Sequence, residues 1–136
     1  MSTPIFESTS PLINDRFINP YIAGENLSPG SLVELTADWT VKKVRTQNSI
    51  KVVGITLTNA VAGRQVSVVG RGQCRVTIWG TTVVAGDQFG SGGGGDTAGT
   101  GSAGTAIQDN TTKNSSILGN IVQGAISGGT AVCNLW

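Results

Sequence analysis

Few side chains in this sequence could carry acid–base or nucleophilic chemistry. It contains no histidine, which removes the Ser-His-Asp and Cys-His nucleophile arrangements and the imidazole ligands of metal sites. An acid–base enzyme would have to rely on eight carboxylates that are scattered along the chain: Glu7, Asp15, Glu25, Glu34, Asp38, Asp87, Asp96 and Asp109. Several stand in predicted turns, where aspartate accepts hydrogen bonds from its own backbone. We therefore predict no catalytic residues, no metal, no cofactor and no enzymatic activity.

The two cysteines are too few for a disulfide scaffold or, without histidine, for a structural zinc site. Each stands in an alternating apolar segment, Cys74 with Val76 and Cys133 with Leu135. Alternation of this kind places side chains on one face of a strand. We therefore predict two buried free thiols.

Phosphate binding has little support in the sequence. The glycine-rich run 90–95 lacks the Gly-Lys-Ser/Thr ending and the following helix of a phosphate-binding loop. Four of the nine basic residues form a small cluster: Lys42, Lys43, Arg45 and Lys51. The net charge is only +1, and polyanion binding grows with the number of phosphates neutralised. We expect no nucleic-acid partner, and interpret the cluster as a solvated strand face or a salt-bridging rim.

Residues 1–14 have neither the basic start nor the apolar run of a signal peptide, and no later segment is apolar enough to span a bilayer. We expect synthesis in a cytoplasm and no membrane partner. Only 12% of the residues are charged, about half of the ~25% typical of soluble domains. The free surface should therefore be unusually uncharged.

Short runs of β-branched residues separated by glycine turns follow one another from residue 21 onward. Seven such runs occur, at 31–36, 41–45, 51–57, 65–69, 73–79, 118–126 and 130–135. Turn signals between them include the glycine-containing segments 28–30, 70–72 and 85–87. Strands this short at this spacing predict an all-β sandwich or barrel.

An internal repeat relates the two parts of this β region. Residues 53–63 align without a gap on residues 118–128, and 27–30 resemble 83–86. The small residues coincide in three pairs: Gly54 with Gly119, Ala60 with Ala125, and Gly63 with Gly128. Two copies are too few for a solenoid. The repeat therefore predicts a closed or nearly closed barrel made of two related halves.

Residues 1–20 read differently from the rest of the chain. They contain Pro4, Pro11 and Pro20 and show no sustained period of 2 or 3.6. They also carry six large apolar side chains: Ile5, Phe6, Leu12, Ile13, Phe17 and Ile18. We expect an extended N-terminal arm ordered by a partner, with a solvated tail as the alternative.

Two further features bear on contacts with partners. Residues 90–104 are nearly all glycine, serine, threonine and alanine, and predict a mobile surface loop. Trp79 ends a predicted strand and Trp136 is the last residue. Either could pack on the edge of the core or anchor an interface, the latter being favoured for Trp136. With the six apolar residues of the arm, they are the predicted interface residues.

The order of these elements resembles that of the capsid decoration, or cement, proteins of tailed phages. The matching segments are 27–33, 53–68 with Gly72, 84–87, and 118–135, within a region that covers 21–136. The resemblance implies a small β-barrel or β-tulip-like domain on the outside of the virion, which binds the major capsid protein, as a homotrimer or dimer. The chain departs from the family in its long glycine loop and its 20-residue arm.

The predicted function is therefore that of a structural decoration protein, made in the host cytoplasm, that stabilises contacts between capsid subunits. The alternative is a small β-barrel binding module, displayed on a virion, that recognises carbohydrate or a host surface. Exposed aromatic side chains gathered on one face would favour this alternative. The aromatic content of only 5% argues against it.

Overall fold

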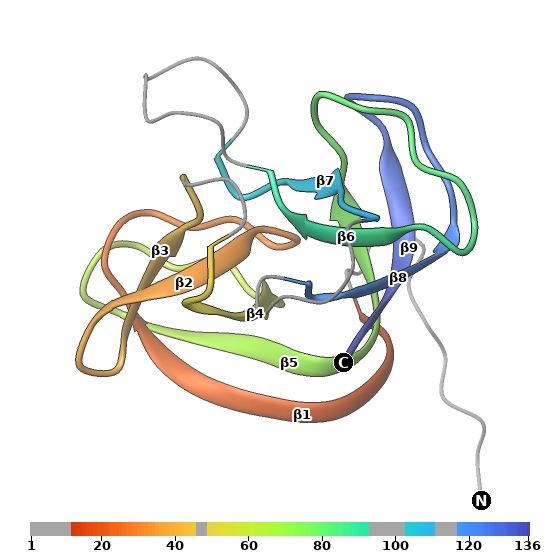
Figure 1. Cartoon of the computed structure of the whole chain (residues 1–136). Helices are drawn as coiled ribbons and strands as arrows, with labels where there is room; N and C mark the ends of the chain where they lie inside the picture. The colour runs from red at the N-terminus through yellow and green to blue at the C-terminus, as the bar shows by residue number, and fades with distance from the viewer. Residues whose placement is uncertain (1–11, 46–48, 93–102, 111–116) are drawn as a thin grey trace, which may run out of the picture.

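The computed structural model describes residues 12–45, 49–92, 103–110 and 117–136 (Figure 1). Within these ranges the protein is all-β, with no helix. Nine strands form one sheet: β1 (Leu12–Ala23), β2 (Leu32–Ala37), β3 (Thr40–Lys43), β4 (Val52–Thr56), β5 (Gln65–Thr77), β6 (Gln88–Ser91), β7 (Ala106–Gln108), β8 (Gly119–Gln123) and β9 (Thr130–Leu135).

Five of the strands close into a barrel. The sheet order β1-β3-β2-β4-β5 returns to its start because β1 also pairs with β5. Every contact in this ring is antiparallel except that between β1 and β3, where Ala23 lies opposite Val41 in parallel. Closure gives every barrel strand a neighbour on both sides, although β1 meets β3 only at Ile22 and Ala23.

The other four strands continue the sheet from β5 and almost close a second ring. Their order is β9-β8-β6-β7, and a parallel bridge between Ile78 and Ala106 joins β7 back to the end of β5. This bridge is the counterpart of the parallel contact between Ala23 and Val41 in the first ring. β5 therefore belongs to both rings, as the last strand of the first unit and the first strand of the second.

The hydrogen bonds confirm the internal repeat residue by residue. Leu27 and Ala60 exchange backbone hydrogen bonds of 2.8 and 3.0 Å, and Val83 and Ala125 exchange bonds of 2.9 and 3.0 Å. The amide of Gly63 donates to Ala23, and that of Gly128 donates to Ile78, both at 2.7 Å. The barrel is nevertheless not assembled from two halves as expected. Each repeat unit forms its own ring, closed in the first unit and nearly closed in the second, because β5 is long enough to serve both.

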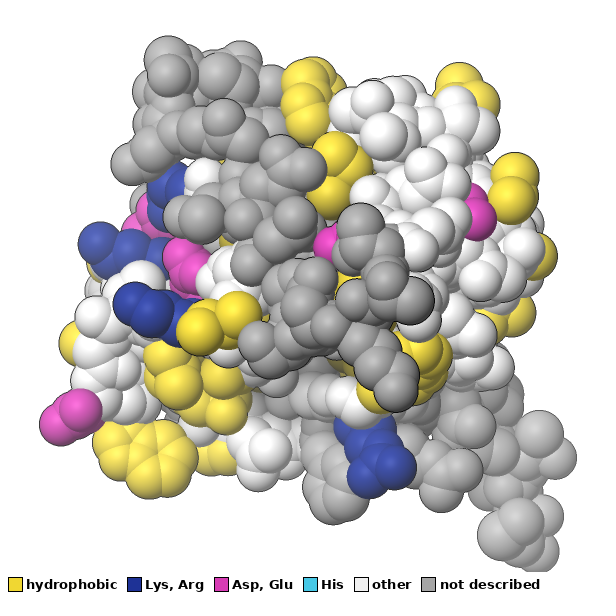
Figure 2. All heavy atoms as spheres, viewed as in Figure 1, with side chains coloured by type: hydrophobic (Ala, Val, Ile, Leu, Met, Phe, Trp, Pro, Cys, Tyr) yellow, Lys and Arg dark blue, Asp and Glu magenta, His cyan; other side chains and the backbone are white. Residues whose placement is uncertain are grey.

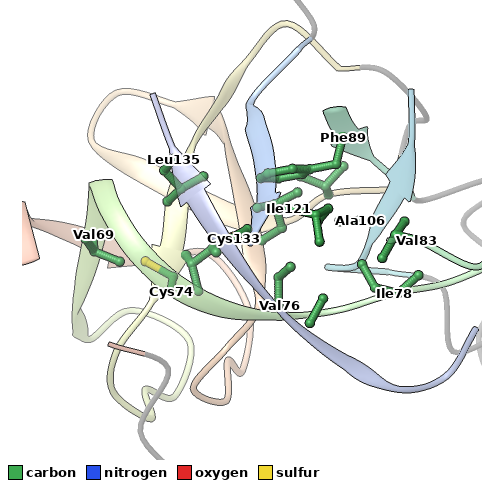
Figure 3. Close-up of a cluster of buried hydrophobic side chains, with 14 residues drawn as sticks. Val69, Cys74, Val76, Ile78, Val83, Phe89, Ala106, Ile121, Cys133 and Leu135 are labelled. Carbon is green, nitrogen blue, oxygen red and sulfur yellow. The ribbon is translucent and has the colours of Figure 1, made fainter. Parts of the chain in front are cut away.

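Two groups of buried side chains hold the rings together. The smaller group fills the first barrel and includes Val33, Val41 and Val66. The larger group contains residues of both units. Leu32 and Ile55 come from the first unit, and Figure 3 shows other members packed between β5 and β9 and around Phe89. Apolar burial of this extent is the main stabilising contribution to such a fold, and here it crosses the boundary between the repeats.

The predicted boundary between arm and domain at residue 20 is wrong for residues 12–20. They belong to β1, which pairs with β5 from Leu12 to Ile22. The ladder contains register shifts between Leu12 and Asn14, and on both sides of Phe17. Each irregularity resets the alternation of side chains, so the sequence shows no period of 2. Residues 1–11, including Ile5 and Phe6, lie outside the described residues.

Two other expectations need correction. The predicted turn at 70–72 lies inside the continuous strand β5. The ends of the predicted glycine loop are ordered as β6 and β7, where Ser91 pairs with Ala106 and Phe89 is fully buried. Small residues there allow close packing, since a Cβ on Gly92 would lie 2.9 Å from a backbone atom of Ala106. Residues 93–102 of the loop lie outside the described residues.

Candidate interaction surfaces

The described residues include both cysteines and five carboxylates whose side chains are placed: Glu25, Glu34, Asp38, Asp87 and Asp109. Within them, no three cysteine, aspartate or glutamate side chains lie close enough together to hold a metal ion. The same residues include no helix that could cross a membrane.

Cys74 and Cys133 lie directly opposite one another on β5 and β9, as free and fully buried thiols. Burial raises the pKa of the Cys74 thiol to about 12. Burial, and then the neighbouring Cys74, raise the pKa of the Cys133 thiol further. Both thiols are therefore protonated and unreactive at neutral pH, and they serve as apolar packing between the two units.

One cation of the basic cluster, Arg45, forms an ion pair with a carboxylate. Arg45 binds Glu25 through two hydrogen bonds of 2.6 and 2.8 Å, and the backbone amide of Lys43 donates to the same carboxylate at 2.8 Å. Burial raises the pKa of Glu25, but these hydrogen bonds and the two cations outweigh it and lower the pKa overall. The shallow groove beside this pair is lined by Lys42 and Glu34 as well. The groove therefore carries charges of both signs.

The structure distributes the predicted interface residues over separate places. Leu12, Ile13, Phe17 and Ile18 belong to β1, and the side chain of Ile18 is 44% exposed. Trp79 and Trp136 are 39% and 60% exposed. These two tryptophans lie at opposite ends of the β5–β9 pair, because Thr77 faces Thr130 while Gly72 faces Leu135. They therefore do not form one patch.

An aromatic surface that the sequence did not predict lies at the tip of the β2–β3 hairpin. Trp39 is 69% exposed, and its ring centroid is 6.3 Å from that of Tyr21. Ile22 donates a backbone hydrogen bond of 2.7 Å to Trp39, and the side chains of Ile22 and Leu35 are also exposed. We call Tyr21, Ile22, Leu35 and Trp39 the hairpin-tip surface. Figure 2 shows hydrophobic side chains gathered in this region, beside Lys and Arg side chains.

The sequence carries only part of the signal for this surface. The segment 37–40 lies between two predicted strands, so a turn with an exposed Trp39 could have been expected. The contact with Tyr21 depends on the parallel pairing of β1 with β3, which a local pattern does not reveal.

A second apolar surface lies at the far end of the second unit. The loop after β5 and the turn between β8 and β9 lie side by side, joined by the Val83–Ala125 bridge and by a hydrogen bond of 2.8 Å from Gly80 to Ser127. Trp79, Val84 and Ile126 are exposed there, and with Val122 they form what we call the loop-end surface. The segments 76–86 and 117–136 contain no charged residue. The carboxylate of Asp87 borders this surface, since it accepts a hydrogen bond of 2.9 Å from the amide of Val84. The large exposed side chains of the surface itself are apolar.

Comparison with known proteins extends the description of the fold. No protein-family model matches the chain, and no curated protein matches it in sequence. Among solved structures, the N base of the head fiber gp8.5 of bacteriophage phi29 is similar, with a TM-score of 0.60 and 20% sequence identity. The match covers 88% of this chain and 93% of that one. The chain therefore shares its fold with the base of a phage head fiber.

Proposed function

We propose that this chain is a non-enzymatic structural protein of a bacteriophage virion that binds the phage head. The observation that carries the proposal is the fold shared with a head fiber base along nearly the full length of both chains. Fold likeness alone does not fix a function. The exposed aromatic and aliphatic residues of the hairpin-tip and loop-end surfaces support a role in binding other proteins.

The finer proposal is that the protein decorates the capsid exterior and, as a cement protein, stabilises contacts between major capsid protein subunits. The exposed apolar side chains of the loop-end surface support this role, because a lasting protein contact would bury them. Ile5 and Phe6 of the N-terminal segment, together with Ile18, Trp79 and Trp136, are proposed as contact residues. A homotrimer or dimer on the capsid would engage several such contacts at once and gain avidity.

Co-sedimentation with undecorated heads tests the proposal. The full chain should pellet with the heads and saturate at a fixed number of copies per particle. Trp79→Ala and Ile126→Ala should reduce the bound copies, since each removes an apolar side chain from the loop-end surface. Val61→Ala is the matched control, because Val61 is exposed and occupies the position in the first unit that Ile126 occupies in the second. Absence of any saturable binding would contradict the proposed role.

The N-terminal segment needs a separate truncation. Because β1 begins at Leu12, residues 1–11 can be removed without shortening a strand. Loss of Ile5 and Phe6 should lower the number of copies bound to heads, while the far-ultraviolet circular dichroism stays unchanged. Equal binding of the truncated and full chains would assign attachment to the β domain alone.

A carbohydrate-binding module displayed on a virion is the second candidate function. The exposed ring of Trp39 beside Tyr21 favours it, since an aromatic face can stack on a sugar ring. Binding to immobilised host-surface polysaccharide that Trp39→Ala abolishes would support this function. Head binding that is unaffected by Trp39→Ala would separate it from the capsid contact.

A further inference from the structure

The hairpin that carries Trp39 also carries the shallow groove of charged residues, which has a volume of about 430 Å³. The groove is formed by both strands of the hairpin and by the segment that follows β1. It is lined by Glu25, Glu34, Thr36, Lys42, Lys43 and Arg45. Thr36 lies only three positions before Trp39 in the sequence. The groove and the hairpin-tip surface are therefore neighbours, and Figure 2 shows apolar, basic and acidic side chains gathered in this region.

Two charged groups of the groove leave a hydrogen-bond donor and an acceptor open to a ligand. Lys42 lies directly opposite Glu34 in the β2–β3 ladder. The stem of Lys42 runs along the backbone of Gly24, where an added Cβ would lie 3.1 Å from its Cγ and Cε. The carboxylate of Glu34 accepts a hydrogen bond of 2.5 Å from the hydroxyl of Ser49 at Oε2. Within the described residues, no hydrogen bond or ion pair involves the Lys42 ammonium or Glu34 Oε1.

This pair of groups suits a ligand that is rich in hydroxyls. An ammonium group only donates hydrogen bonds and a carboxylate only accepts them, whereas a hydroxyl does both. Adjacent hydroxyls of one sugar ring can therefore bind Lys42 and Glu34 at the same time. Hydrogen bonds to charged groups are also stronger than those between neutral groups.

Trp39 supplies an apolar face beside these polar groups. Its side chain is 69% exposed, and its ring lies beside that of Tyr21. Its φ of 57° lies in the left-handed region, which a bulky residue rarely adopts and which glycine adopts freely. An exposed tryptophan adds little to the core, and strained residues of this kind concentrate at ligand sites. The backbone at position 39 is therefore an independent indication of a binding role.

We propose that Trp39 and the groove together form one binding site for a neutral oligosaccharide. One sugar ring stacks on the exposed face of Trp39, and the hydroxyls of a neighbouring sugar bind Lys42 and Glu34. The inference deepens the second candidate function and does not require attachment to a phage head. A protein partner fits this site less well, because it would remove the Lys42 ammonium from water, and the centres of protein interfaces are depleted of charged residues.

The site is remote from the loop-end surface. Gln65, at the start of β5, pairs with Ile22 of the hairpin-tip surface. Thr77 ends β5, and Trp79 of the loop-end surface follows it. A strand of 13 residues extends for up to about 40 Å, and Figure 1 shows the β2–β3 hairpin and the turn between β8 and β9 at opposite ends of the molecule. Binding at one surface therefore leaves the other open.

Oligosaccharide binding by the full chain tests the inference. An array of neutral and acidic glycans is the probe, and titration calorimetry then gives the Kd of the neutral glycan that binds best. Trp39→Ala removes the stacking face and should weaken binding by about tenfold or more. Lys42→Met keeps the stem along Gly24 but removes the ammonium, and Glu34→Gln removes the charge of the acceptor. Each should weaken binding by about tenfold.

Two controls separate this site from the rest of the surface. Trp136→Ala is the matched control for Trp39→Ala, because Trp136 is also exposed but follows β9. It should leave the Kd unchanged, as should Ile126→Ala in the loop-end surface. Circular dichroism of each variant reports whether β structure is retained.

The same variants distinguish saccharide binding from head binding. Trp39→Ala and Lys42→Met should pellet with undecorated heads as the full chain does, so failure of either function is seen separately. Binding of the neutral glycan should persist at raised salt concentration, where attraction between exposed charges is screened. Binding to no glycan on the array, binding to acidic glycans alone, or a Kd that ignores both Trp39→Ala and Lys42→Met would overturn the inference.

Discussion

Gly54 and Gly119 occupy equivalent positions in the two units, and each lies directly against a backbone carbonyl of the neighbouring strand. A Cβ on Gly54 would overlap the carbonyl oxygen of Val69, and a Cβ on Gly119 would overlap that of Asn134. The clash is with backbone, so no side chain can move to relieve it. The repeat therefore preserves glycine at a point of each ring where a neighbouring strand leaves no room for a side chain.

Gly54→Ala and Gly119→Ala should each destabilise the protein by about 3 kcal/mol or more, since a well-packed backbone must shift. The measurement is the free energy of unfolding from urea titration. Gly63→Ala is the matched control: it has a positive φ of 87° but nothing within 4 Å of an added Cβ. It should lower the stability by only about 1 kcal/mol. Equal effects at Gly54 and Gly63 would contradict the steric explanation.

The repeated elements of the fold could be predicted because local chemistry specifies them. Turns such as those at Gly63 and Gly128 need a positive φ, and the strands beside them alternate in the usual way. β1 could not be predicted, because its register shifts remove the alternation and its pairing partner lies some fifty residues away. β6 and β7 were missed because serine, glycine and alanine carry no strand signal, although close packing requires small residues there.

The interaction surfaces also differ in whether one segment of the sequence indicates them or whether they depend on the pairing of distant segments. Exposure of Trp136 could be expected from its position, whereas the sequence left Trp79 open between the edge of the core and an interface. The hairpin-tip surface joins two segments that meet only in the folded barrel. The sequence around Tyr21 or Trp39 alone therefore does not indicate it.

Trp39 is the only described residue other than glycine with a positive φ, at 57°. A left-handed backbone costs a bulky residue roughly 1–2 kcal/mol. Trp39→Gly relieves this cost while losing the ring contact with Tyr21, so the free energy of unfolding should change by less than about 1 kcal/mol. Trp39→Val loses the ring but keeps a β-branched side chain at the positive φ, and should be clearly less stable. Urea titration measures the free energy of unfolding of both variants. Equal values would show that the backbone at position 39 is not strained.

The Glu25–Arg45 pair should make the stability depend on pH in the acid range. The pKa of Glu25 is lower in the folded protein than in the unfolded chain, so folding favours the carboxylate. Its contribution is complete above the unfolded pKa and is lost as the pH falls through the folded pKa. Both side chains are partly exposed, at 25% and 29%, which limits the contribution to about 1 kcal/mol.

Glu25→Gln therefore should be less stable than the unmodified chain by about this amount at pH 7. The difference should shrink as the pH falls below about 4, where glutamate in the unfolded chain takes up its proton. Thermal unfolding at a series of pH values measures it. A difference that is constant with pH would show that the variant acts through packing and not through the charge.

The facing thiols of Cys74 and Cys133 should be inert in the folded protein. The thiolate is the reactive form of cysteine, and burial raises the pKa of Cys74 to about 12 and that of Cys133 further. At pH 8 a thiol of pKa 12 is ionised to roughly one part in ten thousand. Ellman's reagent should therefore label neither cysteine of the native chain on a time scale of minutes, and both after unfolding in guanidinium. Thr82→Cys, at an exposed position, is the control and should add one rapidly labelled thiol. Rapid labelling of two thiols in the unmodified native protein would show that β5 and β9 separate readily, contrary to their shared place in the core.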